Sequence, residues 1–319
     1  MMLKIGNKKY TKKILIIFFT FAYIIVCNAQ NANSTFTSRF EQLVQSMIMD
    51  NYRPFSLIRE MNAENLSDSL IPLLKQYEVI PNSTVQDCIY ESYFEYGMQS
   101  KNVIFKKEMI FCLLNACACV DSIELSYSCS KSINFLVMFE NNLFDKEVTN
   151  IINERARRNG RYSLDYAYLS SKLYQKQMIP VFEEQLQNMK YNENKYKFNF
   201  ILARLGHKQS INIVRDSLQN IYIEDRLLNE KIFLYVRQKA IVELLFNDLY
   251  SNQRETPYYE EWMEKPVDGL CANRALHLLT MLIKKFPIQQ KEDISYSKDD
   301  LDIARRWVKQ HKNKYDIIE

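Results

Sequence analysis

The feature that most constrains this chain of 319 residues is a phrase that it carries twice. The stretch KLYQKQMIPVFEEQL begins at Lys172, and RLGHKQSINIVRDSL begins at Arg204. Matching positions keep one offset, since Leu173 corresponds to Leu205 and 205 − 173 = 32. A fixed period of this length is typical of chains built from a repeated supersecondary unit, whose copies stack because none can bury its apolar face alone.

Each copy has the pattern of a helix, a tight turn and a second helix. Ile179, Phe182 and Leu186 recur at the spacing of one helix face. Pro180 falls in the opening turn of that helix, where a missing N–H has no consequence. Gly206 falls where the first helix of the later copy must end, and glycine tolerates the left-handed conformation of such an ending. The phrase therefore predicts a helical hairpin.

Weaker copies and further amphipathic segments flank these two hairpins. The segments with apolar positions at helical spacing are SLIPLLKQYEV, NVIFKKEMIFCLLNAC, EVTNIINERAR, YVRQKAIVELL and GLCANRALHLLTMLIKKF. The last pattern, SKDDLDIARRWVKQ, predicts a C-terminal capping helix over 298–313, opened by a capping box of Ser297 and Asp300. With only 5 Gly and 7 Pro to shape turns, the chain favours long helices and an all-α fold.

At these residues, and most clearly in the LGHKQSI turn and the VRQKAI helix start, the chain resembles the HEAT and armadillo type of α-solenoid. The resemblance is good over residues 140–250 and faint over 55–140. It implies an α-α superhelix of stacked hairpins forming a single helical-repeat domain over 30–319. The resemblance is to an architecture and not to a chemistry. An irregular helical bundle would share most of these patterns and is the alternative.

The first thirty residues have the order of a secretory signal peptide. MMLKIGNKKYTKK carries five lysines, Ile14 to Val26 carry no charge, and a small residue, Ala29, follows. This order predicts a signal peptide over 1–29 and a protein exported to the periplasm or the extracellular space. The apolar stretch is shorter than the ~20 residues of a membrane-spanning helix, so no span is expected after cleavage. A lipid anchor at Cys27 is the weaker alternative, because Val26 before it is bulky.

Removing this segment changes the charge balance. The chain has 42 basic and 38 acidic residues, and the loss of five lysines leaves 37 against 38, or −1. A nucleic-acid-binding domain needs a basic excess, so no nucleic-acid partner is expected.

The cysteines and histidines offer little for catalysis or metal binding. Cys112, Cys117, Cys119 and Cys129 are spaced closely enough to suggest zinc, but they lie on an apolar pattern. Core packing or a disulfide is the better interpretation, and no metal or cofactor is expected. His207 is expected in a solvated turn and His277 as a satisfied helix residue. The sequence lacks HExxH, GxSxG and a phosphate-binding glycine-rich loop, which favours a non-catalytic protein.

The most unusual segment is ETPYYEEWMEKPVDGLC, which interrupts the helical pattern with two prolines and a glycine. It holds four candidate binding residues, since tyrosine and tryptophan give rigid contact area for peptides or sugars: Tyr258, Tyr259, Glu261 and Trp262. The simpler interpretation is a connecting loop held by a buried Trp262. An enzyme that acts on glycan or peptide is the alternative function, with Glu260, Glu261 or Asp268 as its acids.

Two further groups of residues have both a structural and a functional interpretation. In RARRNGR, Arg157 and Arg158 would bind an anion or an acidic partner, or would complement the dipole of a helix that ends before Gly160. A set of clustered tyrosines would lie at the edge of the core or line a binding groove: Tyr162, Tyr166, Tyr168, Tyr174, Tyr191 and Tyr196. The sequence thus predicts an exported binding protein whose partner is a protein or peptide, with a glycan as the second class.

Overall fold

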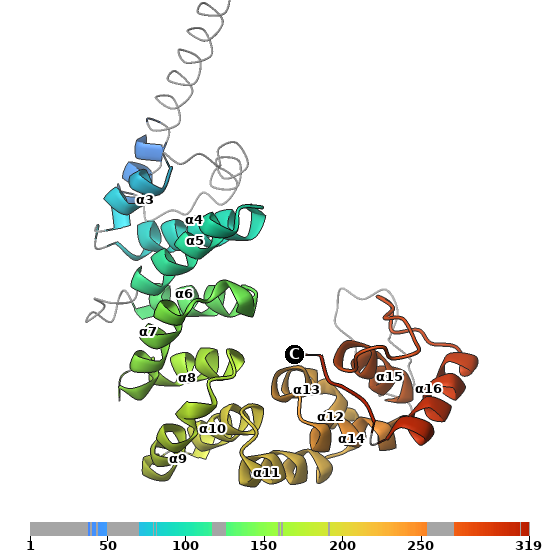
Figure 1. Ribbon diagram of the computed structural model, residues 1–319. Helices are drawn as coiled ribbons and strands as arrows, with labels where there is room; N and C mark the ends of the chain where they lie inside the picture. Colours follow the sequence, from blue (N-terminus) through green and yellow to red (C-terminus); the bar gives the residue numbers. More distant parts are fainter. Residues whose placement is uncertain are drawn as a thin grey trace, which may run out of the picture. The chain divides into compact units, whose positions relative to one another are not determined.

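The computed structural model describes residues 38–49, 70–116, 126–253, 271–312 and 314–318, apart from 39, 43, 79, 81, 159, 161 and 191. Throughout these residues the fold is all-α (Figure 1), and the one extended pairing is an isolated antiparallel bridge between Ile283 and Ile317. The prediction of an all-α chain of packed helical pairs is confirmed. The signal peptide predicted over 1–29 and Cys27 lie outside the described residues.

The chain divides into two compact units, residues 1–144 and 145–319. The helices of the first unit are α3 (Leu70–Glu78), α4 (Ser83–Gln99), α5 (Val103–Ala116) and α6 (Ser126–Met138), followed by the 3-10 helix η1 (Asn141–Leu143). A further helical segment covers 38–49. The sequence predicts a single helical-repeat domain over 30–319, and this stays a prediction.

Helix α4 is the centre of the first unit, since it packs against α3, α5 and α6. It begins at an N-cap, Asn82, whose side-chain oxygen accepts from the backbone N–H of Val85 at 3.1 Å. Its tyrosines Tyr90, Tyr93 and Tyr96 are all buried. The sequence analysis did not identify this helix, because its buried residues surround the helix instead of forming one stripe.

The second unit consists of helices that pack against their neighbours in sequence and against the next pair (Figure 1). In chain order the helices are α7 (Lys146–Arg157), α8 (Ser163–Lys172), α9 (Ile179–Asn188) preceded by η2 (Lys176–Met178), α10 (Asn192–Arg204), α11 (Lys208–Gln219), α12 (Ile223–Leu228), α13 (Glu230–Val236), α14 (Lys239–Asp248), α15 (Cys271–Leu282) and α16 (Lys298–His311). Helix α10 lies between α8 and α13 and also contacts α9 and α11.

A continuous apolar core runs through the second unit from α10 to the C-terminus. It includes Phe233, Leu245, Leu279 and Val308, which come from four different helices. Burial of this apolar surface is the main term that holds the helices together, at roughly 25 cal/mol per Å². Each helix is too short to persist alone in water, so packing stabilises it more than its intrinsic propensity does.

Several local predictions are confirmed at the ends of the helices. Pro180 lies in the first turn of α9, and Gly206 has a left-handed φ of 93° directly after α10. Ser297 and Asp300 form the capping box of α16, in which each side chain accepts from the other residue's backbone N–H. Leu301 and Val308 of the predicted stripe are buried.

The cysteines that the structure describes are core residues, as predicted. Cys112, Cys129 and Cys271 are each at most 3% exposed, and Cys88 is buried as well. Burial raises the pKa of the Cys112 thiol to about 11. Cys117 and Cys119 lie outside the described residues.

Candidate functional site

Most of the binding residues predicted from the sequence fall in one segment that the structure does not describe. Residues 254–270 are outside the described ranges, and they contain Tyr258, Tyr259, Glu261 and Trp262. The same holds for Glu260 and Asp268, the acids of the enzyme alternative. Two candidate features lie within the described residues. One is the end of the helix that carries Arg157 and Arg158, and the other is the set of turns in the repeated hairpins.

Arg157 and Arg158 lie at the C-terminal end of α7, where cations complement the helix dipole. Arg157 forms an exposed ion pair with Glu154 at 2.7 Å, and Arg158 is the exposed C-cap residue. Helix α7 ends before Gly160 as expected. However, Gly160 does not adopt the left-handed conformation that is common after a helix, because the chain leaves the helix through the extended backbone of Arg158.

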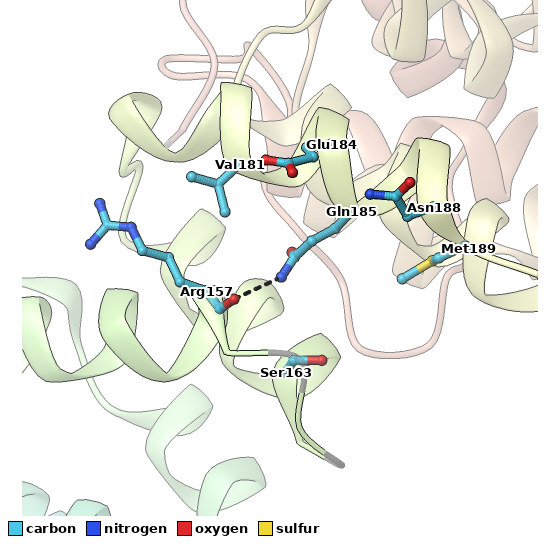
Figure 2. A pocket seen from close by; sticks show the side chains of 7 residues that line it. All are labelled: Arg157, Ser163, Val181, Glu184, Gln185, Asn188 and Met189. Carbon is cyan, nitrogen blue, oxygen red and sulfur yellow. Dashed lines mark hydrogen bonds between the residues drawn. The ribbon is translucent and has the colours of Figure 1, made fainter.

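A pocket of about 270 Å³ opens beside this end of α7 (Figure 2). Its lining comes from α7, α8 and α9 and from the residue after α9: Arg157, Ser163, Val181, Glu184, Gln185, Asn188 and Met189. The amide nitrogen of Gln185 donates to the carbonyl oxygens of Ala156 and Arg157 at 2.9 and 3.5 Å. This side chain therefore satisfies the last carbonyls of α7 and ties α9 to it.

The chemistry of this pocket suits binding more than proton transfer. Val181 and Met189 give it an apolar wall, while Ser163 and Asn188 supply polar groups. The guanidinium of Arg157 extends away from Gln185 (Figure 2). Of the described residues that line the pocket, Glu184 alone carries a carboxylate, whereas glycoside cleavage uses two carboxyl groups roughly 5–10 Å apart.

A second candidate feature is the set of turns that join α8 to η2 and α9, α10 to α11, and α13 to α14. We call these turns the three corners and define them as Tyr174–Lys176, Gly206–Lys208 and Arg237–Lys239. Each opens with a residue in the left-handed conformation, at φ 54°, 93° and 50°. Each also ends with a lysine, which is the first residue of the helix that follows.

The backbone hydrogen bonds of the first two corners are the same. In the first, the N–H of Tyr174 donates to Ser171 and that of Gln175 to Ser170, at 3.0 and 3.3 Å. In the second, Gly206 donates to Ala203 and His207 to Leu202, both at 3.0 Å. These are two Schellman motifs at one repeat spacing.

The third corner is the simpler variant of this ending. The N–H of Arg237 donates to Phe233 at 3.2 Å, as in an αL motif. The echo thus extends to a third hairpin at a similar interval, 237 − 206 = 31. Its turn interrupts the predicted helical segment YVRQKAIVELL, because the left-handed Arg237 ends α13 and α14 begins at Lys239.

Arg204 joins the three corners to one another. This side chain is 4% exposed and lies at the end of α10. Its guanidinium donates to the carbonyls of Ser171, at 3.2 Å, and Lys172, at 3.5 Å, which end α8, and to that of Tyr235, in the last turn of α13. The side-chain amide nitrogen of Gln238 donates a hydrogen bond to the backbone carbonyl of Arg204 at 3.0 Å. Consecutive corners therefore lie side by side.

Aromatic rings pack around this arginine. The guanidinium carbon of Arg204 lies 4.7 Å from the ring centre of Tyr174 and 5.1 Å from that of Tyr235. Tyr235 in turn stacks on Tyr168 with ring centres 4.1 Å apart, and its hydroxyl shares a hydrogen bond with Ser171. Burial raises the pKa of Tyr235 and of Tyr168 above the ordinary tyrosine value.

Three cations accumulate behind the corners. Burial, together with the neighbouring charges of Arg204 and Arg237, lowers the pKa of Lys172 to about 8. Burial and Arg204 also lower the pKa of Arg237. Lys172 and Arg204 are the last residues of α8 and α10, at an offset of 204 − 172 = 32, whereas Arg237 is the first residue of the third corner, directly after α13.

The histidine predictions are corrected in one case. His207 is not a solvated turn residue, because Nδ1 contacts the Ser210 hydroxyl at 2.9 Å and Nε2 contacts Glu183 at 2.8 Å. His277 is a satisfied helix residue as expected, with Nδ1 3.3 Å from the Tyr296 hydroxyl. Within the described ranges, His, Cys, Asp and Glu side chains form no group of three or more that could hold a metal ion.

The corner residues were missed as a site, although the sequence carries a signal for them. The triplets Tyr-Gln-Lys, Gly-His-Lys and Arg-Gln-Lys recur at 174, 206 and 237. A cation precedes the first two triplets, at 172 and 204, and the third triplet itself begins with a cation, Arg237. Tyr168 and Tyr174 were considered as groove residues, and the structure places both beside this cluster.

Comparison of the chain with models of known protein families, with curated proteins and with solved structures found no match. None of the helices that the structure describes is both long enough and apolar enough to cross a membrane.

Proposed function

We propose that this chain is an exported, non-catalytic binding protein that engages a protein partner through a surface of HEAT-like helical repeats. The export part of the proposal rests on the basic, apolar and small-residue order of residues 1–29. The binding part rests on the second unit, where three successive hairpins present equivalent side chains at equivalent places.

The observation that carries this proposal is the regularity of the three corners. Tyr174, Gly206 and Arg237 have the same backbone conformation, and Arg204 ties all three together. Repeat proteins use such regular surfaces to contact extended partners, because each stacked unit contributes the same kind of contact at a fixed interval. Tyr174, at the first corner, adds an aromatic ring of the kind that is enriched at protein interfaces.

A two-step experiment tests the proposed function. Cross-linking of the tagged chain in its native cells identifies candidate partners, and each candidate is then purified and titrated against the purified chain. We expect saturable binding by one exported partner and competition by the untagged second unit, residues 145–319. If no purified candidate binds saturably, or if the chain turns over a substrate and loses this activity on substitution of one acid, the binding function is wrong.

Sequencing of the mature N-terminus tests the export part separately. We expect the mature chain to begin at Gln30, after cleavage at Ala29. A chain that retains Met1 or Met2 in the cytoplasmic fraction would contradict export and leave the binding proposal to its own test.

A further inference from the structure

We propose that the three corners form a basic docking edge for an acidic, extended polypeptide segment. This inference rests on the proposed function and names the class of partner that the repeat surface takes. The first observation is the position of the lysines. Lys176, Lys208 and Lys239 are all exposed, and each is the first residue of the helix that follows its corner.

This placement of lysine is unfavourable for the helices themselves. The N-terminal end of a helix carries a partial positive charge and is stabilised by acidic side chains. The helices α7, α8, α12, α13 and α16 follow this rule with an acid in the first turn. The helices α11 and α14, which begin at corner lysines, and α9, which follows the first corner after η2, have none, as is also true of α3 to α6 and α15. An anion bound here would meet both the helix ends and the lysines.

Few acids near the corners are available to neutralise these cations. Among the described residues, none of the three lysines forms an ion pair, and Lys239 instead lies 4.9 Å from the ring centre of Tyr315. Two acids near the corners are Glu183, which His207 contacts at 2.8 Å, and Glu243, which lies one turn after Lys239 in α14. Lys172, Arg204 and Arg237 lie directly behind and add to the positive potential.

The backbone of the corners places two further side chains beside the cations. Left-handed φ values are favourable for glycine, and the middle corner has Gly206. The outer corners hold Tyr174 and Arg237 in the same conformation, which costs a side-chain-bearing residue stability. Both side chains point into the cationic cluster, since Tyr174 lies over Arg204 and Arg237 lies close enough to lower the pKa of Lys172. Lys285 and Ile294, which lie outside the corners, share this conformation, so the positions of the two side chains and not the strain are what the corners add.

The spacing of the corners favours a polypeptide over other polyanions. Packed helices lie about 8–10 Å apart, and this sets the interval from one corner to the next. An extended chain advances about 3.3–3.6 Å per residue, so every third side chain repeats at about 10 Å. An acidic residue at every third position of a partner would therefore meet one lysine per hairpin. Without residues 1–29, the predicted signal peptide, the chain has 37 basic and 38 acidic residues, and this balance does not suit a nucleic-acid partner, which needs a basic excess.

The probe for this edge is a fluorescent synthetic peptide of about 12 residues with glutamate at every third position. A control peptide has the same sequence with glutamine at those positions. Anisotropy titrations with the purified full chain at low ionic strength measure the two affinities. We expect the glutamate peptide to bind more tightly and its affinity to fall as salt is added, because exposed ion pairs are screened.

The edge variant replaces one lysine at each corner: Lys176→Ala, Lys208→Ala and Lys239→Ala. Its control removes the same charge from exposed lysines outside the corners: Lys190→Ala, Lys231→Ala and Lys309→Ala. We expect the edge variant to lose affinity for the glutamate peptide by about tenfold or more and the control by less than about twofold. A third chain with arginine at the three corner positions keeps the charge and should bind like the wild type, which separates lost charge from lost folding.

Three results would overturn the inference. The first is that the edge variant binds the glutamate peptide as tightly as the wild type does. The second is that the control variant loses as much affinity for this peptide as the edge variant loses. The third is that another polyanion binds more tightly than the peptide and depends on the same three lysines. The polyanions to compare are single-stranded DNA, a sulfated polysaccharide and phosphatidylserine vesicles. If the native partner identified by cross-linking binds the edge variant as it binds the wild type, the docking edge is wrong while the proposed binding function stands.

Discussion

At the scale of single residues, Arg204 holds the corners together through bonds that no other side chain could make at once. Its planar guanidinium donates to carbonyls that end α8 and α13, and it is almost fully buried. Lysine has a single ammonium group and cannot reproduce this fork of donors. Arginine at this position therefore joins three hairpins rather than one.

Loss of Arg204 should destabilise the chain strongly. We expect Arg204→Ala to lower the free energy of unfolding by about 2–4 kcal/mol, because it leaves buried carbonyls without a partner. Arg204→Lys should fall between this variant and the wild type. Urea denaturation followed by circular dichroism measures the change. The matched control is Arg215→Ala, whose exposed side chain binds only Asp216 and whose loss should cost less than about 0.5 kcal/mol; equal losses in the two variants would contradict the role of Arg204.

Lys172 should make the free energy of unfolding depend on pH. Its folded pKa of about 8 lies below the ordinary value of 10.5, which the unfolded chain retains. Between these two values the unfolded chain binds more protons than the folded chain, so the contribution of Lys172 to stability increases as the pH rises from about 8. Below that pH both states are protonated, and the unfavourable burial of the charge is fully present.

The variant Lys172→Met removes this contribution. We expect its free energy of unfolding to rise less between pH ~8 and ~10 than that of the wild type. Ionisation of tyrosines affects both chains alike, so the difference between them is the quantity to compare. The exposed Lys190→Met should keep the wild-type dependence, and an identical pH dependence in Lys172→Met and the wild type would show that the Lys172 pKa is ordinary.

At the scale of elements, Gly97 in α4 is required by the close approach of a neighbouring ring. A Cβ atom there would lie 2.7 Å from Cζ of Phe139 and 3.1 Å from Cβ of Met109. Phe139 is buried and packs edge-on against Phe94, so its ring has little room to move.

The variant Gly97→Ala should therefore lose stability, although alanine is the better helix former. Overpacking costs about 1–3 kcal/mol, and the gain in helix propensity returns up to about 1 kcal/mol. Thermal unfolding compares this variant with Gly160→Ala, whose Cβ would meet no atom within 4 Å and which should be nearly neutral. A variant as stable as the wild type would mean that the α4 contact with Phe139 is wrong.

The capping box of α16 gives a second prediction at this scale. Ser297→Ala removes the acceptor for the backbone N–H of Asp300, and we expect a loss of about 1 kcal/mol in the free energy of unfolding. The neighbouring variant Lys298→Ala removes an exposed side chain and should change stability by less than about 0.5 kcal/mol. Equal effects of the two variants, measured by urea denaturation, would contradict the cap.

At the scale of the whole molecule, the second unit should fold by itself. Its continuous core draws all its residues from within 145–319. We expect residues 145–319, expressed alone, to be helical by circular dichroism and to unfold cooperatively in urea. A shorter chain over 145–248 lacks α15 and α16, which supply a large part of that core, and should lose cooperativity. Non-cooperative unfolding of the longer chain would favour the single domain over 30–319 predicted from the sequence.

Much of the architecture was predictable because it depends on local pattern. The helical spacing of Ile179, Phe182 and Leu186, the helix stop at Gly206 and the cap at Ser297 each act over a few residues. These signals placed α9 and α16 and predicted the all-α fold. Helix α4 was missed because it is buried on several sides and carries no single apolar stripe. Helix α6 was missed although its buried residues share one face, because that face includes the polar Ser132 beside Cys129, Ile133 and Leu136.

The sequence by itself determined that helices form, where several of them start and stop, and that one hairpin is repeated. Only the tertiary structure decided which repeated residues meet, because the side chains that gather at the corners come from three helices about 32 residues apart. Arg204 and Lys172 occupy matching positions of the repeated phrase. Nevertheless, Arg204 is buried against backbone carbonyls, whereas Lys172 lies beside two further cations. Burial and proximity set the bonds and the pKa of such groups, and these are properties of packing that no linear pattern contains.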